Sequence, residues 1–173
     1  MPRKPVTSVS SASSTASVRL TPGGYTRLAE RVAHITEVRL PQMRDLLVER
    51  ERDERDVAEF ERLLEEAVAL DGLLGEAEIL TDDIDGFEGR VDLGMRVRVT
   101  LADGSDAWVR PVHPAEAAVD DERISVTSPL ATALLGARAS HVVWVSAPAG
   151  VWACTVLEID PRVSADPSSG EEA

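Results

Sequence analysis

Cysteine and long apolar runs are scarce in this sequence of 173 residues, basic residues are outnumbered by acidic ones, and each of these features argues against a class of protein. The single cysteine, Cys154, cannot form a disulfide within the chain, which fits a reducing cytoplasm. No run of about 18 apolar residues occurs, so no membrane span is predicted. Residues 1–18 hold Arg3 and Lys4 but no apolar core, so they do not resemble a secretory signal. We expect a cytoplasmic protein without a membrane partner.

Acidic residues outnumber basic ones, with 31 Asp and Glu against 18 Lys and Arg, and the formal net charge is −13. Proteins that bind free DNA or RNA present clustered Lys and Arg to the phosphates, because contacts with the phosphates provide much of the affinity. The sequence has no comparable basic cluster. Autonomous nucleic-acid binding is therefore not expected.

The motifs that mark common catalytic or metal sites are absent too. One cysteine and three widely spaced histidines give no zinc-binding pattern, and neither a glycine-rich phosphate loop nor a G-x-S-x-G motif occurs. The segment 81–92 has the spaced aspartates of a calcium loop but lacks its first carboxylate and its final Glu, so we interpret it as a linker. No intrinsic metal or cofactor is predicted, and the histidines are expected to be structural or surface residues (His34, His113 and His141).

Residues 19–78 have the apolar spacing of a helical hairpin. Apolar residues recur at intervals of 3, 4 and 3 on both sides of a charged run, which predicts two helices with one narrow apolar seam each (Tyr25, Leu28, Val32 and Ile35, continued by Leu46; then Val57, Phe60, Leu64 and Ala67). Two such helices bury their seams most simply against each other, as an antiparallel coiled coil. Thr21 is expected to cap the first helix, with Pro22 just inside it, and Pro41 is expected to bend it.

From about residue 79 the apolar period shortens towards two, which predicts β-strands (96–101, 106–112, 123–128, 141–147 and 151–159). Asp103–Gly104 is the turn of the first β-hairpin, and a short helix that Gly136 ends interrupts the strands at 128–136. The fold class is therefore α+β. Its parts are a disordered tail, the helical hairpin, a mostly antiparallel β domain and a second, acidic tail (1–18, 19–78, 79–160 and 161–173).

Residues 49–56 read ERERDERD and lie where the two helices would have to turn. One interpretation is a solvated helix surface with pairs such as Glu51 and Arg55, each contributing about 0.2–0.5 kcal/mol. An uninterrupted helix, however, would leave both apolar seams in water, so a turn is needed here. Asp53 is then the N-cap of the second helix and Asp56 its third residue, which places both carboxylates at an exposed helix N-terminus. Such acids either help to hold a divalent cation or only cap the helix.

Four stretches form an ordered set of motifs across both predicted domains: LTPGGYTRLAERV, GMRVRVTLADG, ISVTSPLATALLG and VVWVSAPAG, at 20–32, 94–104, 124–136 and 142–150. In this order they resemble the opening helix, the first strand pair, the S-P-[IL]-x-x-x-[LI]-[LI]-G segment and the closing P-x-G hairpin of the Gre (GreA/GreB) family. This is a family of bacterial transcription elongation and transcript-cleavage factors. The resemblance covers roughly residues 19–160. It implies that the β domain has an FKBP-like fold.

The resemblance also implies a partner and a mechanism. The β domain is expected to dock on RNA polymerase through Ser128, Pro129 and Leu130, while the helical hairpin enters the secondary channel. In the family's tip pattern D-x-x-E-N-A-E-Y, the two acids fall on Asp53 and Asp56 within DERDVAEF. They would act in trans by helping the polymerase to hold a shared Mg²⁺ during RNA cleavage, so the protein is not expected to be an enzyme alone. A monomer is expected.

Two sets of alternatives stay open. Asp56 and Val57 replace the Glu and Asn of the family's pattern, and Ile79 follows Phe60 by only 19 residues, which shortens the hairpin by about two turns, or about 10 Å. These departures favour a modulator or inhibitor of the polymerase's active site over a factor that stimulates cleavage. Outside this function, the alternatives are an FKBP-like prolyl isomerase or peptide-binding module, and a structural coiled-coil partner protein.

Overall fold

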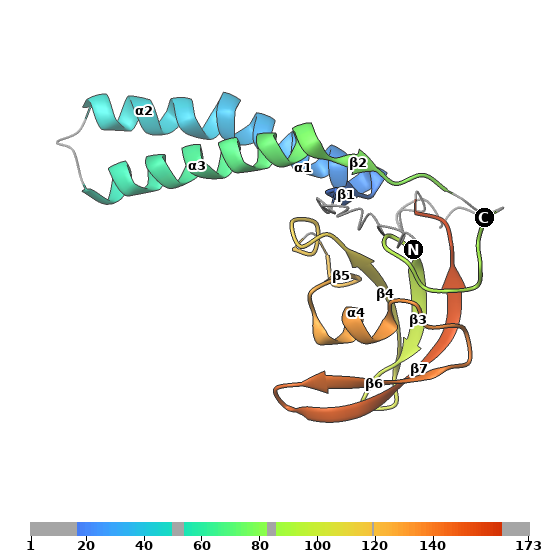
Figure 1. Ribbon diagram of the computed structural model, residues 1–173. Coiled ribbons are helices and arrows are strands. Elements are labelled where there is room, and N and C mark those ends of the chain that lie inside the picture. Colours follow the sequence, from blue (N-terminus) through green and yellow to red (C-terminus); the bar gives the residue numbers. More distant parts are fainter. Residues whose placement is uncertain (1–16, 50–53, 83–85, 119, 164–173) are drawn as a thin grey trace, which may run out of the picture.

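The computed structural model describes residues 17–49, 54–82, 86–118 and 120–163, which form a helical part and a β-sheet part (Figure 1). The predicted α+β class is confirmed. No helix in these ranges is long and apolar enough to cross a membrane. The tails predicted at 1–18 and 161–173 lie mostly outside the described residues.

The helical part consists of two antiparallel arms (Figure 1). Three segments placed end to end make the first arm: α1 (Pro22–His34), the π-helical turn η1 (Ile35–Arg39) and α2 (Leu40–Glu49). The second arm is α3 (Glu54–Glu76), which packs along all three segments. Residues 50–53, between α2 and α3, lie outside the described residues, so the connection of the arms as a hairpin stays a prediction.

The arms share a hydrophobic core of their own, made of Ile35, Leu40, Met43, Leu63 and Ala67, with Phe60 packed against it. The expected seam is wrong at two positions, because Leu46 and Leu64 are 39% and 44% exposed. Leu63, which neighbours Leu64, is buried in its place.

The π-helical turn explains why the seam changes phase along the first arm. A regular helix that buries Ile35 would next bury a residue three or four positions later, yet the next buried apolar residue is Leu40, five positions on. The backbone N–H of Leu40 donates to the carbonyl oxygen of Ile35, which is the i to i+5 bond of a π-turn. This π-turn lies just before Pro41, which has no N–H to donate, whereas the bend expected at Pro41 stays a prediction.

Two short strands connect the ends of the helical part. In β1 (Arg19–Leu20) and β2 (Glu78–Ile79) the chain runs parallel, with Arg19 opposite Glu78 and Leu20 opposite Ile79. Leu20 is fully buried. Directly after β1, Thr21 is the N-cap of α1 as expected, and its side chain accepts a hydrogen bond from the Gly24 N–H.

The second part is a five-stranded sheet with the order β5-β4-β3-β7-β6. Its strands are β3 (Arg96–Thr100), β4 (Asp106–Val112), β5 (Arg123–Ser125), β6 (Val142–Ala147) and β7 (Gly150–Asp160). All pairs are antiparallel except β4 with β5. The mostly antiparallel sheet agrees with the expectation, whereas the FKBP-like assignment stays a prediction.

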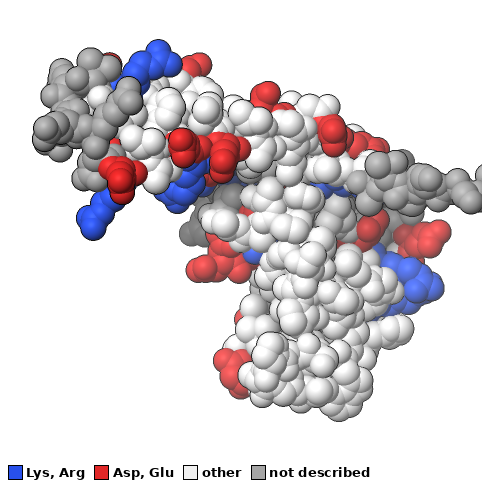
Figure 2. Space-filling view, turned by 60° about the vertical axis from the view of Figure 1, so that its left-hand side comes forward, with Lys and Arg blue, Asp and Glu red and all other residues white. Residues whose placement is uncertain are grey.

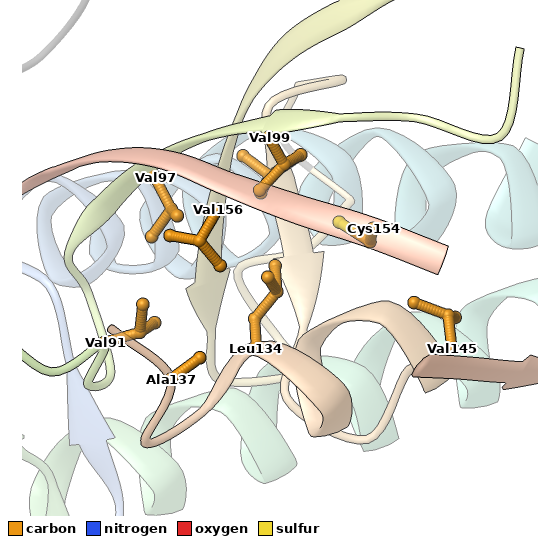
Figure 3. Close-up of a cluster of buried hydrophobic side chains, with 9 residues drawn as sticks. Val91, Val97, Val99, Leu134, Ala137, Val145, Cys154 and Val156 are labelled. Carbon is orange, nitrogen blue, oxygen red and sulfur yellow. The ribbon is translucent and has the colours of Figure 1, made fainter. Parts of the chain in front are cut away.

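One short helix, α4 (Pro129–Leu134), packs against this sheet and closes its core (Figure 3). Leu134 and Ala137 face the valines of β3 and β7, and Val91, Val145 and Cys154 complete the buried cluster (with Val97, Val99, Val109 and Val156). This core shares no residue with the core of the helical arms. The described part of the chain therefore has two separate apolar cores.

Candidate functional site

Of the two acids expected at the tip of the hairpin, Asp56 lies among the described residues, at the end of the helical part. The first turn of α3 lies at the end of the arms far from the sheet (Figure 1), and it contains Glu54 and Asp56. Asp56 is partly exposed, while Asp53 lies outside the described residues. Carboxylates are favourable here because the N-terminus of a helix carries the positive end of its dipole.

Within the described residues, no group of three or more His, Cys, Asp or Glu side chains could hold a metal ion. Asp56 alone offers one carboxylate, and a divalent cation such as Mg²⁺ takes its remaining ligands from water, phosphates or other carboxylates. The chemistry open to Asp56 is therefore to add one ligand to a site that another molecule provides.

Two ion pairs connect the first helical arm with α3. The guanidinium of Arg31 donates to Glu66 Oε1 from Nε at 2.7 Å, and Arg39 Nη2 donates to Glu59 Oε1 at 2.8 Å. Both pairs are partly exposed, so each contributes at most about 1 kcal/mol. The buried apolar side chains between the arms, rather than these pairs, fix where the first turn of α3 lies.

The three expected docking residues lie together at the start of α4. Ser128 is its N-cap, and its Oγ accepts a hydrogen bond from the Ala131 N–H at 3.2 Å. Pro129 is exposed, whereas Leu130 is half-buried and packs against the core of the sheet. Of the three, Pro129 is thus the most accessible to a partner, while Ser128 and Leu130 also hold α4 in place.

The junction of the two parts contains a buried carboxylate that the sequence analysis missed. Glu116 is fully buried and accepts hydrogen bonds from the backbone N–H of Thr21, at 3.1 Å, and from its hydroxyl. Nearby, Asp120 pairs with Arg27 of α1 and with Arg123 of β5. These contacts fix α1 to the loop between β4 and β5.

Sequence reasoning had no signal for Glu116, because its partner Thr21 is 95 positions away and the segment AEAAV around it looks like an ordinary surface stretch. A weak hint is Gly24, which is unusual in the first turn of a helix. A Cβ at Gly24 would lie 1.7 Å from Oε2 of Glu116, so the glycine leaves space for the carboxylate.

The described histidines and the cysteine form no catalytic group. His34, His113 and His141 lie on three different segments, and His113 Nδ1 accepts a hydrogen bond from the Ala115 N–H. Cys154 is buried among the valines of the sheet, and burial raises the pKa of its thiol. A buried thiol with a raised pKa is a poor nucleophile.

The comparisons with known proteins identify the family of this chain. Residues 87–161 match the family model described as "Transcription elongation factor, GreA/GreB, C-term". The chain is 32% identical to the transcription elongation factor GreA of Thermotoga neapolitana, over 84% of this chain and 98% of the relative. It is also 32% identical to GreA of Chloroflexus aurantiacus, over 81% and 95%. Among solved structures it is similar to the GreA factor homolog 1 (Gfh1) of Thermus thermophilus, with 31% identity, coverage of 82% and 97%, and a TM-score of 0.36.

The matched relatives extend across the helical part as well as the sheet, so the class of protein is a transcription elongation factor with both parts present. The chain belongs to the GreA/GreB family of transcription elongation factors. The family assignment made from the sequence motifs is confirmed.

Proposed function

We propose that this protein binds RNA polymerase and regulates elongation through the secondary channel of the enzyme. The observation that carries the proposal is an arm with its own apolar core that extends away from the sheet and ends in an acidic first turn (Figure 1). An arm of this kind can bring a carboxylate into a recessed active site while the sheet part remains outside. Membership in a family of transcription elongation factors supports RNA polymerase as the enzyme on which such an arm would act.

Docking is assigned to the start of α4. Ser128 and Leu130 hold this short helix against the sheet, and Pro129 presents a rigid apolar surface to the outside. These contacts support a preformed docking surface, because little side-chain freedom would be lost on binding. The net charge of −13 argues that the partner surface is a protein rather than free nucleic acid.

At the active centre, Asp53 and Asp56 would act on a Mg²⁺ ion shared with the polymerase and would catalyse nothing alone. Two outcomes are compatible with this position. The acids either assist RNA cleavage by the polymerase or change its active site without cleavage. We favour the second, because Asp56 is one methylene shorter than the Glu of the family's pattern and the arm is short, and small misplacements at a reacting centre cost large rate factors.

The test uses stalled, backtracked transcription complexes and measures the release of short RNA and the rate of elongation. Wild-type protein is compared with Asp53→Ala/Asp56→Ala and with a control of equal charge change, Glu65→Ala/Asp71→Ala, whose residues are exposed elsewhere on α3. We expect wild type and control to change elongation, and the tip variant to bind polymerase without this effect.

If wild-type protein causes the release of short RNA and the tip variant does not, the protein stimulates RNA cleavage instead of modulating the active site without cleavage. If wild-type protein neither binds polymerase nor changes elongation, the proposal fails. A prolyl isomerase is not favoured, because the comparisons point to an elongation factor and nothing in them points to isomerisation.

A further inference from the structure

One stretch of the sheet has no charged residue in a chain whose residues are 28% charged. Residues 142–157, which cover β6 and most of β7, contain no Asp, Glu, Lys or Arg. The space-filling view agrees with this. Red and blue side chains are frequent on the helical part, whereas the lower end of the sheet part, where β6 and β7 lie in Figure 1, is nearly white (Figure 2).

The outer face of this hairpin exposes large apolar side chains. Val142, Trp144 and Val151 are 56%, 69% and 65% exposed. Trp144 lies opposite Ala153, and residues that are opposite each other in a sheet point to the same face. Alternate residues such as Val145 point to the other face and into the core. The exposed face is therefore continuous across both strands, which is typical of a surface that another molecule covers.

β6 is also an unprotected edge of the sheet. It ends the strand order, and among the described residues its one strand partner is β7. Natural edge strands are usually protected by charges, proline, bulges or short length, because their free N–H and C=O groups can pair with another chain. β6 has six residues without charge or proline, and its pairing with β7 has no register shift.

We propose that β6 pairs with β6 of a second copy of this chain, so that two molecules form one continuous sheet. A second copy is a suitable occupant because the straight, uncharged edge of β6 can pair with an identical edge about a two-fold axis. Two chains of net charge −13 repel each other over most of their surfaces. Residues 142–157 contain no acidic side chain, so two copies can approach each other there without bringing acidic side chains together. The proposal replaces the monomer expected from the sequence, and it is independent of the proposed function.

The geometry of such a pair is restricted. A two-fold axis makes the two β6 strands antiparallel and the interface self-complementary. Exposed residues of one strand must lie opposite exposed residues of the other, so that Trp144 meets Trp144, or Ser146, of the second copy. The face lies on the side of the sheet opposite to α4, which packs on the core side, so the residues assigned to docking remain accessible.

The size of the patch predicts a weak association. A contact between two six-residue strands is smaller than the roughly 20–30 residues per partner of a standard interface. We therefore expect a dimer that forms as the concentration rises between about 1 μM and about 1 mM, the range of weak affinities. Since repulsion between the acidic chains opposes it, raising the salt from about 0.1 M to about 1 M should strengthen the association.

Sedimentation velocity of the full chain over this concentration range tests the proposal. Trp144→Lys places like charges across the two-fold axis and should raise the dissociation constant roughly tenfold or more. The matched control is Val68→Lys on α3, a residue that is 65% exposed, close to the 69% of Trp144. The control should associate like wild type. Ser146→Lys on the same face of β6 gives a second test without loss of an apolar side chain, and far-UV circular dichroism checks folding.

Weaker association of both β6 variants together with stronger wild-type association in salt would support the proposal. A wild-type chain that stays monomeric at all concentrations in both salts overturns it. So does equal weakening by Val68→Lys. If the chain is monomeric and Trp144→Lys abolishes binding to RNA polymerase, the face belongs to the polymerase and the proposal is wrong.

Discussion

The carboxylate of Glu116 accepts two hydrogen bonds from Thr21, and the Thr21 hydroxyl accepts a third from the Gly24 N–H. This chain of bonds continues from the loop after β4 into the first turn of α1. A buried carboxylate is costly unless it is fully hydrogen-bonded, and here the N-terminus of α1 adds a favourable dipole. Glu116 is therefore one of the side chains that hold the two parts together, beside Asp120 with its ion pair to Arg27.

Removal of this side chain should destabilise the protein. Glu116→Ala leaves the buried N–H of Thr21 without its acceptor, and we expect a loss of about 1–3 kcal/mol in the free energy of unfolding. Urea unfolding followed by circular dichroism measures this loss. The control Glu65→Ala removes an exposed carboxylate from α3 and should change stability by less than about 0.5 kcal/mol.

Gly24→Ala completes a double-mutant cycle for the same prediction. In the wild-type background the new Cβ would collide with Glu116 and push the carboxylate off its hydrogen bonds, so Gly24→Ala destabilises. With Glu116→Ala present the collision is gone, and alanine gains about 1 kcal/mol of helix propensity over glycine. Additive effects of the two changes would contradict the proposed role of Glu116.

At the scale of elements, the sequence predicted the strands more accurately than the helical seam. Strand β4 spans Asp106–Val112 as expected, because alternation of apolar residues and a turn at Gly104, with φ of +82°, define it locally. In the first arm the seam required knowledge of η1, since a π-turn shifts every later residue of that arm by one position, and Leu46 is exposed while Leu40 and Met43 are buried. On α3 the two neighbours Leu63 and Leu64 both fit a period of 3.6 residues between Phe60 and Ala67, so spacing alone could not show that the structure buries Leu63.

This pair of neighbours gives a matched test of the core between the arms. Leu63→Ala removes a side chain that is 7% exposed and should cost about 2–4 kcal/mol, because it loses apolar burial and leaves a cavity. Leu64→Ala makes the same chemical change at a side chain that is 44% exposed and should cost less than about 1 kcal/mol. Urea unfolding followed by the helical signal at 222 nm compares them. A larger loss for Leu64→Ala would show that the seam runs through Leu64 after all.

At the scale of the molecule, the order of the two parts follows from the sequence, whereas their junction does not. The change of apolar period near residue 79 separates helices from strands, and β2 ends at Ile79. The contacts that join the parts are polar and far apart in the sequence, such as Thr21 with Glu116 and Arg27 with Asp120. Long-range polar contacts leave no periodic signal.

Because the two apolar cores share no residue, we expect the two parts to unfold separately when one is weakened. Cys154 reports on the sheet, since its thiol is buried, its pKa is raised by burial, and it is the one cysteine of the chain. In Leu63→Ala the helical signal should fall at lower urea than the concentration at which Cys154 reacts with a thiol reagent. Leu64→Ala should show wild-type behaviour in both measurements. If helix loss and thiol reaction in Leu63→Ala coincide at every urea concentration, the contacts of Glu116 and Asp120 join the two cores into one cooperative unit.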